Sequence, residues 1–168
     1  MKKTAIILTA FAMLLFVAGC SSMHKMEQPK SFAESLYAAK NPYIGNNSAD
    51  ADLVSLMRLG NFGKYTLSVE AKEHPYTLSI RYMYLNSSVD REKFNTTMTN
   101  SAILLLALID NCEQISWTYA SDEGQQSNAI GVDYVKDVME IDVKNIAKDE
   151  KKFTELCNQL FPDRATTS

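Results

Sequence analysis

Only two imidazole side chains are present for acid–base or metal chemistry in this chain. His24 lies in a polar N-terminal segment, and His74 lies beside Pro75 in a segment that the surrounding pattern predicts to be a turn. A general base or a metal ligand must be held rigidly against its partner, and neither position predicts such a setting. The Gly-x-Ser-x-Gly, glycine-rich phosphate-binding and His-Glu-x-x-His motifs are also absent from the sequence. Histidine-based catalysis is therefore not predicted.

Four carboxylates cluster late in the chain, at Asp133, Asp137, Glu140 and Asp142. On a helix Asp133 and Asp137 would share one face, where a hard cation could bridge them. Lysines are interleaved with these acids, however, and the glycine-containing loop of a calcium site is missing. The pattern favours a solvated acidic face, so we predict no metal, no cofactor and no enzymatic activity. A hydrolase that uses Asp133 and Asp137 is the less favoured alternative.

Cys112 and Cys157 can be interpreted in two ways. If they form a disulfide, closing a loop of about 46 residues would stabilise the fold by roughly 4 kcal/mol in the chain-entropy model. Two small buried thiols would pack equally well without a bond. The sequence leaves both interpretations open.

Cys20 has the clearest chemical setting of the three cysteines. The segment 14–22 reads LLFVAGCSS, in which an apolar run ends in small residues before Cys20, and Lys2 and Lys3 precede that run. This is the pattern of a bacterial lipoprotein signal. It predicts cleavage after residue 19 and a lipid on Cys20, whose two acyl chains suffice for stable anchoring. The alternative, an uncleaved membrane helix over residues 4–19, would be shorter than the roughly 17–25 residues that cross a bilayer.

The charge of the chain excludes some partners. The formal charge is −3, and loss of Lys2 and Lys3 with residues 1–19 would make it about −5, with no basic block anywhere. Nucleic acid is therefore not predicted as a partner. Anionic lipid headgroups would not attract this surface either, so the predicted membrane contact is the lipid on Cys20, at the extracytoplasmic face of the cell membrane.

The chain divides into four predicted regions. Residues 1–19 are the signal peptide, and residues 20–40 are the lipidated cysteine and a polar tether with a short helix at its end. Residues 41–161 form one domain, a size at which one core is expected. Residues 162–168 are a disordered tail.

Apolar spacing predicts the elements of that domain. Helices are predicted over 48–59, 90–111, 132–139 and 146–161, and alternation predicts strands over 65–71, 76–84 and 115–119. The first two strands form an antiparallel hairpin, and residues 122–128 are a polar surface loop. The order is α-β-β-α-β-α-α. We therefore predict an α+β fold with helices packed on one face of a three-stranded, mainly antiparallel sheet.

The uncovered face of that sheet is the predicted partner surface. Alternation gives it short hydroxyl side chains and two charged residues: Thr66, Ser68, Glu70, Thr77, Ser79, Arg81, Ser116 and Thr118. A merely solvated outer face, which is common in antiparallel sheets, is the alternative. Trp117 and the tyrosines of the strands alternate with the buried positions, so we interpret them as core residues rather than as a carbohydrate-stacking platform.

Three short segments resemble one family. They are NPYIGNNS at 41–48, PYTLSIRY at 75–82 and ALIDN at 107–111, in this order. The chain over about residues 40–161 is similar to the DUF4825 family of domains of unknown function, which occurs in lipoproteins and membrane proteins of low-GC Gram-positive bacteria. The resemblance implies no catalytic or ligand residue. It implies an extracytoplasmic attachment with a sensing or accessory role.

These observations together predict a surface lipoprotein with a non-catalytic binding, sensing or accessory domain. We expect the domain to act through contacts with a membrane protein. A domain that binds a small ligand or a cell-wall component, in an apolar cleft between sheet and helices, is the alternative.

Overall fold

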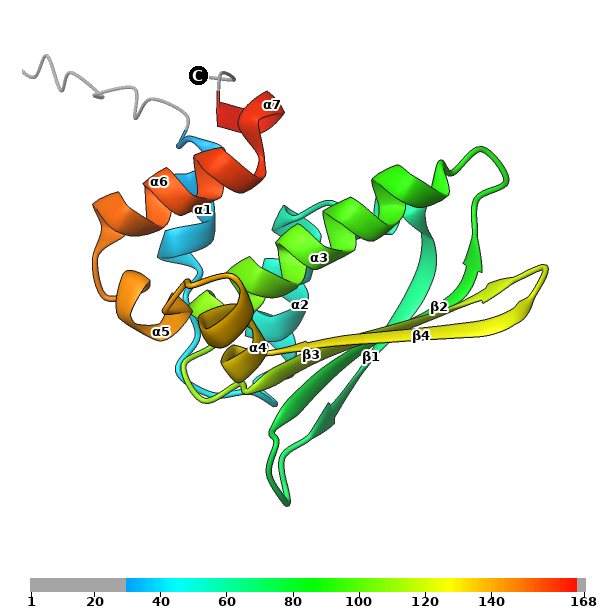
Figure 1. Ribbon diagram of the computed structural model, residues 1–168, viewed down its shortest axis with the longest axis horizontal. Coiled ribbons are helices and arrows are strands. Elements are labelled where there is room, and N and C mark those ends of the chain that lie inside the picture. The colour runs from blue at the N-terminus through cyan, green and yellow to red at the C-terminus, as the bar shows by residue number, and fades with distance from the viewer. Residues whose placement is uncertain (1–29, 166–168) are drawn as a thin grey trace, which may run out of the picture.

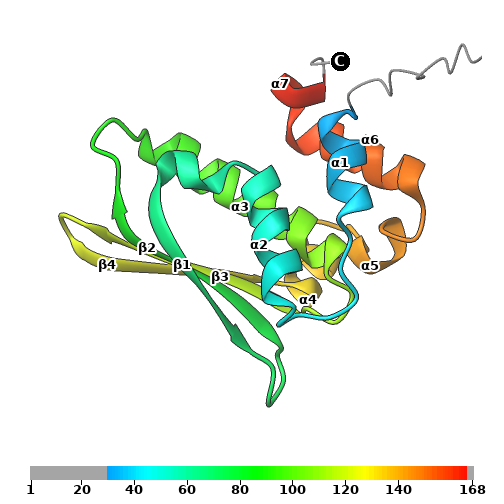
Figure 2. The same cartoon turned by 180° about the vertical axis from the view of Figure 1, so that it is seen from behind.

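The computed structural model describes residues 30–165. In chain order the elements are α1 (Phe32–Ala38), α2 (Asn47–Leu56), the 3₁₀ turn η1 (Leu59–Phe62), β1 (Gly63–Glu70), β2 (Thr77–Leu85), α3 (Arg91–Leu108), β3 (Gln114–Ser121), β4 (Gly124–Gly131), α4 (Val132–Val138), α5 (Val143–Ile146), α6 (Glu150–Leu160) and α7 (Pro162–Ala165). The fold is α+β, as predicted. The helices α2 and α3 lie on one face of a twisted sheet, and α1, α6 and α7 lie together at one end of the molecule (Figures 1 and 2).

The sheet has four strands in the order β1-β2-β3-β4 and is mixed. β1 and β2 form the antiparallel hairpin that the alternation predicts. β2 and β3 are parallel, however, so the prediction of a three-stranded, mainly antiparallel sheet is wrong. The chain leaves the end of β2, returns along the 18 residues of α3 and enters β3 at the starting end of β2. Such a helical crossover is what parallel neighbours require.

The fourth strand, β4, occupies most of the segment predicted to be a polar loop. It pairs with β3 in antiparallel register from Ser121↔Gly124 to Gln114↔Gly131, across a two-residue turn. The prediction failed because β4 is an edge strand in which only Ile130 is buried. A strand with one buried side chain shows no alternation of apolar and polar residues.

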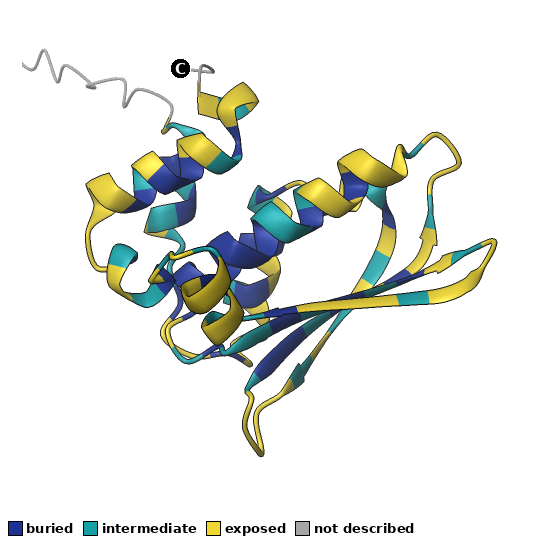
Figure 3. Cartoon of the chain, viewed as in Figure 1, coloured by how far each residue is buried: buried dark blue, intermediate teal, exposed yellow. Residues whose placement is uncertain are grey.

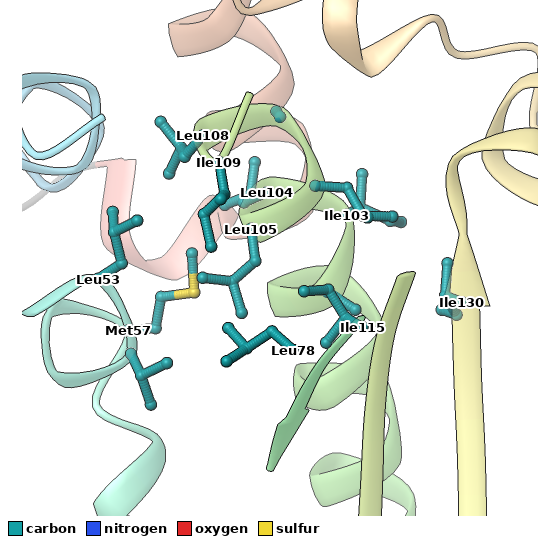
Figure 4. Packing of buried hydrophobic residues seen from close by; sticks show 14 of the residues in the cluster. Leu53, Met57, Leu78, Ile103, Leu104, Leu105, Leu108, Ile109, Ile115 and Ile130 are labelled. Carbon is teal, nitrogen blue, oxygen red and sulfur yellow. The ribbon is translucent and has the colours of Figure 1, made fainter. Parts of the chain in front are cut away.

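α3 is the central core helix. Its N-cap Asp90 accepts a hydrogen bond from the Lys93 N–H at 3.0 Å, and its second half is buried all round while its first half is largely exposed (Figure 3). Leu105 from α3 meets Leu78 from β2 and Met57 from the end of α2 (Figure 4). The space between the sheet and the helices is thus filled by side chains.

The ends of the domain differ from the prediction. The short helix at the end of the expected tether 20–40 is present as α1, but it belongs to the core, because Ala33 and Leu36 are buried and the Phe32 ring lies 5.6 Å from Phe161. The expected disordered tail 162–168 begins with α7, where the Arg164 guanidinium donates to the Met57 carbonyl at 3.1 Å. Cys20, His24, residues 1–29 in general and residues 166–168 lie outside the described residues.

Candidate functional site

The residues predicted for the partner surface lie in register across one face of the sheet. One row runs Thr66↔Arg81↔Thr118 from β1 to β3, and β4 extends it to Ser127. The next row runs Ser68↔Ser79↔Ser116, and the hydroxyl oxygens of Ser79 and Ser116 are 2.7 Å apart. The helices of the described chain cover the opposite face (Figures 1 and 2). We refer to this surface, the predicted residues together with Ser127, as the open face.

Arg81 is the cation at the centre of the open face. Its side chain is exposed, and within residues 30–165 no hydrogen bond or ion pair engages its guanidinium. Beside it is a hollow of about 310 Å³ whose lining includes Met83, Thr118 and Gln125. The guanidinium is therefore free to bind an acceptor on another molecule.

Thr77 belongs to the open face by register but is not available for binding. It pairs with Glu70 and Gln114 on the neighbouring strands. Its side chain is buried, and its hydroxyl donates to the Pro75 carbonyl at 2.9 Å. The other predicted residues of the open face are partly or fully exposed.

A pairing of His74 with Glu113, which no pattern in the sequence indicates, lies at the end of the sheet where β2 and β3 begin. The His74 Nδ1 is 2.7 Å from Glu113 Oε2, and the His74 ring is stacked on Tyr76 with centroids 4.1 Å apart. The Tyr76 N–H also donates to Glu113 Oε2, at 2.9 Å. The hydrogen bonds from His74 and from this N–H hold the pKa of Glu113 below its usual range.

Beside this pair is a cavity of about 540 Å³ whose lining includes Gln114, Gly131 and Asp133. The residues described here supply no serine or cysteine nucleophile to it, since its lining consists of His74, Pro75, Glu113, Gln114, Gly131, Val132 and Asp133. The arrangement can hold a small polar molecule. His74 and Glu113 are 39 positions apart, so only knowledge of the parallel β2–β3 pairing could have joined them.

The late acidic residues do not converge. Asp133 and Asp137 are exposed on α4, Glu140 follows this helix with a left-handed backbone at φ 58°, and Asp142 accepts from the Asn145 N–H at 3.0 Å as the N-cap of α5. Within the part of the chain that the structure describes, three or more metal-ligating side chains are nowhere grouped. Asp142 thus has a structural role, and the other three acids are exposed to solvent.

Cys112 and Cys157 are free, buried thiols in the structure. The Cys112 thiol donates to the Gln114 carbonyl at 3.3 Å. Burial raises the pKa of both thiols to about 11, so neither is a thiolate near neutral pH. The structure therefore has the second of the two predicted arrangements, in which the thiols are packed without a bond.

A buried polar cluster fixes the loop before α2. Asn41 and Asp50 are only 2% and 1% exposed, and the Asn41 Nδ2 donates to Asp50 Oδ1 at 2.9 Å. The Gly45 N–H donates to Asp50 Oδ2 at 2.8 Å, and the Ile44 N–H donates to Asn111 Oδ1 at 2.7 Å. Burial raises the pKa of Asp50, and the hydrogen bonds from Gly45 and Asn41 partly offset that effect.

Comparison with known proteins places these features within one family. No curated protein and no solved structure matches the chain, and within residues 30–165 no helix is long and apolar enough to span a bilayer. A family model with the description "Domain of unknown function (DUF4825)" matches residues 36–133. This segment is more than half of the chain, and it contains all four strands, the Asn41–Asp50 cluster and Asn111. The resemblance noted in the sequence is thereby confirmed, and the chain belongs to the DUF4825 family.

Proposed function

We propose that the protein is a membrane-anchored surface lipoprotein whose domain binds a membrane protein through the open face. The proposed anchor is a lipid on Cys20, which lies outside the described residues. The domain follows at α1, at the end of the molecule where α6 and α7 also lie, whereas the turn between β3 and β4 lies at the opposite end (Figure 1). A tether that enters beside α1 leaves the open face accessible to a neighbour in the membrane.

One observation carries the proposal. The open face presents two rows of mostly short polar side chains, the first of which includes the unpaired guanidinium of Arg81, with no helix of the described chain over it. Short hydroxyl side chains lose little conformational entropy on binding, and a surface that they cover can contact a second protein closely. Arg81 adds a charged donor that selects a partner with a carboxylate at the matching place.

The experiment is photo-crosslinking in the native membrane. A photoactivatable residue replaces Ser116 on the open face, and captured proteins are identified by mass spectrometry. We expect one membrane protein to be captured by the otherwise unchanged chain. The double change Ser68→Lys with Arg81→Glu should abolish that capture, because it puts a long side chain and the opposite charge on the surface.

The matched control changes the same kinds of residue on α6, with Asn158→Lys and Lys151→Glu, both of which are exposed. This variant should capture the same membrane protein as the wild type. Equal capture by all three chains, or capture of nothing, would exclude the open face as the binding surface.

The cavity beside His74 and Glu113 supports a second candidate function, binding of a small ligand or cell-wall component. The predicted cleft between sheet and helices is filled by the core, whereas this cavity is open and contains an ionised carboxylate. A ligand that binds there stabilises the fold saturably. Thermal unfolding with a panel of amino sugars and cell-wall peptides should then show a rise in Tm that Glu113→Gln removes. A rise that Glu113→Gln leaves unchanged would assign the ligand to another place.

A further inference from the structure

The two edges of the sheet are built differently. At the β1 edge the register shifts between Lys64 and Tyr65, and the strand carries the charged residues Lys64 and Glu70. At the other edge β4 reads GQQSNAIG, with neither charge nor proline, and all eight of its residues pair with β3 without a register shift. Bulges, charges and prolines are the devices that keep sheet edges from pairing with further strands. β1 has two of these devices and β4 has none.

The free edge of β4 presents unpaired backbone groups at defined residues. The Val132 N–H donates to the Glu113 carbonyl at 2.9 Å. Hydrogen-bonded pairs recur at every second residue of an antiparallel ladder, so the even positions of β4 direct their backbone groups toward β3. The odd positions direct theirs toward the free edge, and these are Gln125, Ser127 and Ala129. A strand added at this edge would continue the sheet through these groups.

Charge brackets this edge at both ends. Asp122 and Glu123 precede β4, Asp133 follows it, and all three side chains are exposed. Two copies of β4 paired about a two-fold axis would be antiparallel, which would bring Asp122 and Glu123 of one copy near Asp133 of the other. That arrangement is repulsive. A strand with an uncharged middle and basic ends is instead complementary to the edge.

We propose that β4 accepts an extended segment of a protein partner as a fifth strand, and that this segment has basic residues at its ends. The proposal is independent of binding at the open face, since it uses backbone groups at the edge of the sheet rather than side chains on its surface. The backbone contacts supply affinity, and the acids at the two ends of β4 select the charge of the segment.

The test uses the full chain in detergent micelles and a defined pool of peptides. Each peptide has two lysines at both ends and a six-residue core in which every position is Val, Thr, Ser, Tyr or Gln, and a matched pool has glutamates at the ends. We expect the lysine-ended pool to bind saturably and to slow the NMR amide exchange of Gln125, Ser127 and Ala129 at least tenfold. The glutamate-ended pool should bind at least tenfold more weakly.

Two variants separate backbone pairing from other contacts. Ser127→Pro removes an outward N–H but no hydrogen bond to β3, which an edge strand tolerates, and it should weaken peptide binding at least tenfold. Ser127→Val keeps that N–H and should bind within twofold of the wild type. A third measurement does not depend on the fold of a variant, because lysine-ended peptides N-methylated at alternate positions should also lose binding.

Three results would overturn the proposal. They are absence of saturable binding by the lysine-ended pool, equal binding of plain and N-methylated peptides, and a solution dimer of the chain that Ser127→Pro dissociates. Loss of peptide binding on the open-face change Ser68→Lys with Arg81→Glu would likewise move the site from the edge to the face. Failure of the membrane crosslinking, by contrast, leaves these outcomes unaffected.

Discussion

Asp50 holds the loop that connects α1 to α2. Both of its carboxylate oxygens accept hydrogen bonds, one from the Asn41 side chain and one from the Gly45 N–H, and the group is almost completely buried. A carboxylate in this position acts as an internal cap for a loop that makes few backbone hydrogen bonds of its own. The first of the three segments that resemble the family, residues 41–48, therefore helps to fix the conformation of this loop.

The change Asp50→Ala should lower the free energy of unfolding by roughly 2–3 kcal/mol, because the Gly45 N–H and one N–H of the buried Asn41 amide lose their acceptor. Denaturant unfolding measures this difference. Asp52 lies two residues further along the same helix and is exposed, so Asp52→Ala should change stability by less than about 0.5 kcal/mol. Similar losses in both variants would contradict the role given to Asp50.

Glu113 predicts a pH dependence of stability. Its pKa is lowered in the folded state, so its contribution is present at pH above its ordinary pKa and is lost as the pH falls through the lowered value. Wild-type protein should thus lose stability in that acid range, and Glu113→Gln should lose less of it. Urea midpoints across the range from pH 3 to about 6 test this. Parallel pH profiles of the two chains would show that Glu113 makes no such contribution.

Lys144, on α5, caps the C-terminal end of the central helix α3. Its ammonium donates to the carbonyls of Leu106, at 2.5 Å, and of Ile109, at 2.7 Å, where α3 ends and carbonyls lack helical partners. Burial lowers the pKa of this lysine. α3 is therefore fixed at both ends, at its N-cap Asp90 and at Lys144 from α5. This helix connects the end of β2 to the start of β3, so the two strands run parallel.

Replacing Lys144 by Met should destabilise the protein by about 2 kcal/mol, because two hydrogen bonds to a charged donor at a helix C-terminus are lost. Lys148 is exposed on the following turn, and Lys148→Met serves as the control with little expected effect. Thermal unfolding compares them, and equal Tm values for the two variants would contradict a capping role.

The turn after α4 predicts a stabilising change. Glu140 adopts a left-handed backbone conformation at φ 58°, which costs roughly 1–2 kcal/mol for a residue with a Cβ. Glycine removes this strain but also raises the backbone entropy of the unfolded chain, which offsets part of the gain. The net effect of Glu140→Gly should be a stabilisation of roughly 0.5–1 kcal/mol. Lys136→Gly within α4 should have the opposite sign. Chemical denaturation measures the free energy of unfolding of both variants. A loss of stability in Glu140→Gly would contradict the strain assigned to this position.

The limits of prediction from sequence follow from burial. β1 and β2 alternate because one side of each packs on the core, and α3 shows its helical stripe for the same reason. β4 exposes nearly all its side chains and so has no pattern. The open face could be predicted because it is the complement of a buried face. The His74–Glu113 pair could not, because it depends on the parallel pairing of strands that a long helix separates.

The chain as a whole combines a proposed anchor at Cys20 with a domain that begins at α1. If residues 1–19 are removed from the variant, changing Cys20 to Ala should transfer the protein from the membrane fraction to the supernatant, because the remaining chain without a lipid has no other predicted membrane contact. Cell fractionation with immunoblotting measures this. Retention of the variant in membranes, together with a wild-type mass that still includes residues 1–19, would instead support the uncleaved helix.

The position of α1 has a mechanical consequence. A pull applied through the N-terminus reaches α1 first, and this seven-residue helix is held to α6 and α7 by side-chain packing. The load then arrives at Asn41, whose backbone N–H and carbonyl bond to Leu108 and Asp110 and whose amide bonds to Asp50. We therefore expect α1 to separate from α6 and α7 under tension before the Asn41–Asp50 cluster gives way. Stretching the proposed tether would then lengthen the protein while the sheet, with its open face and its β4 edge, stays folded.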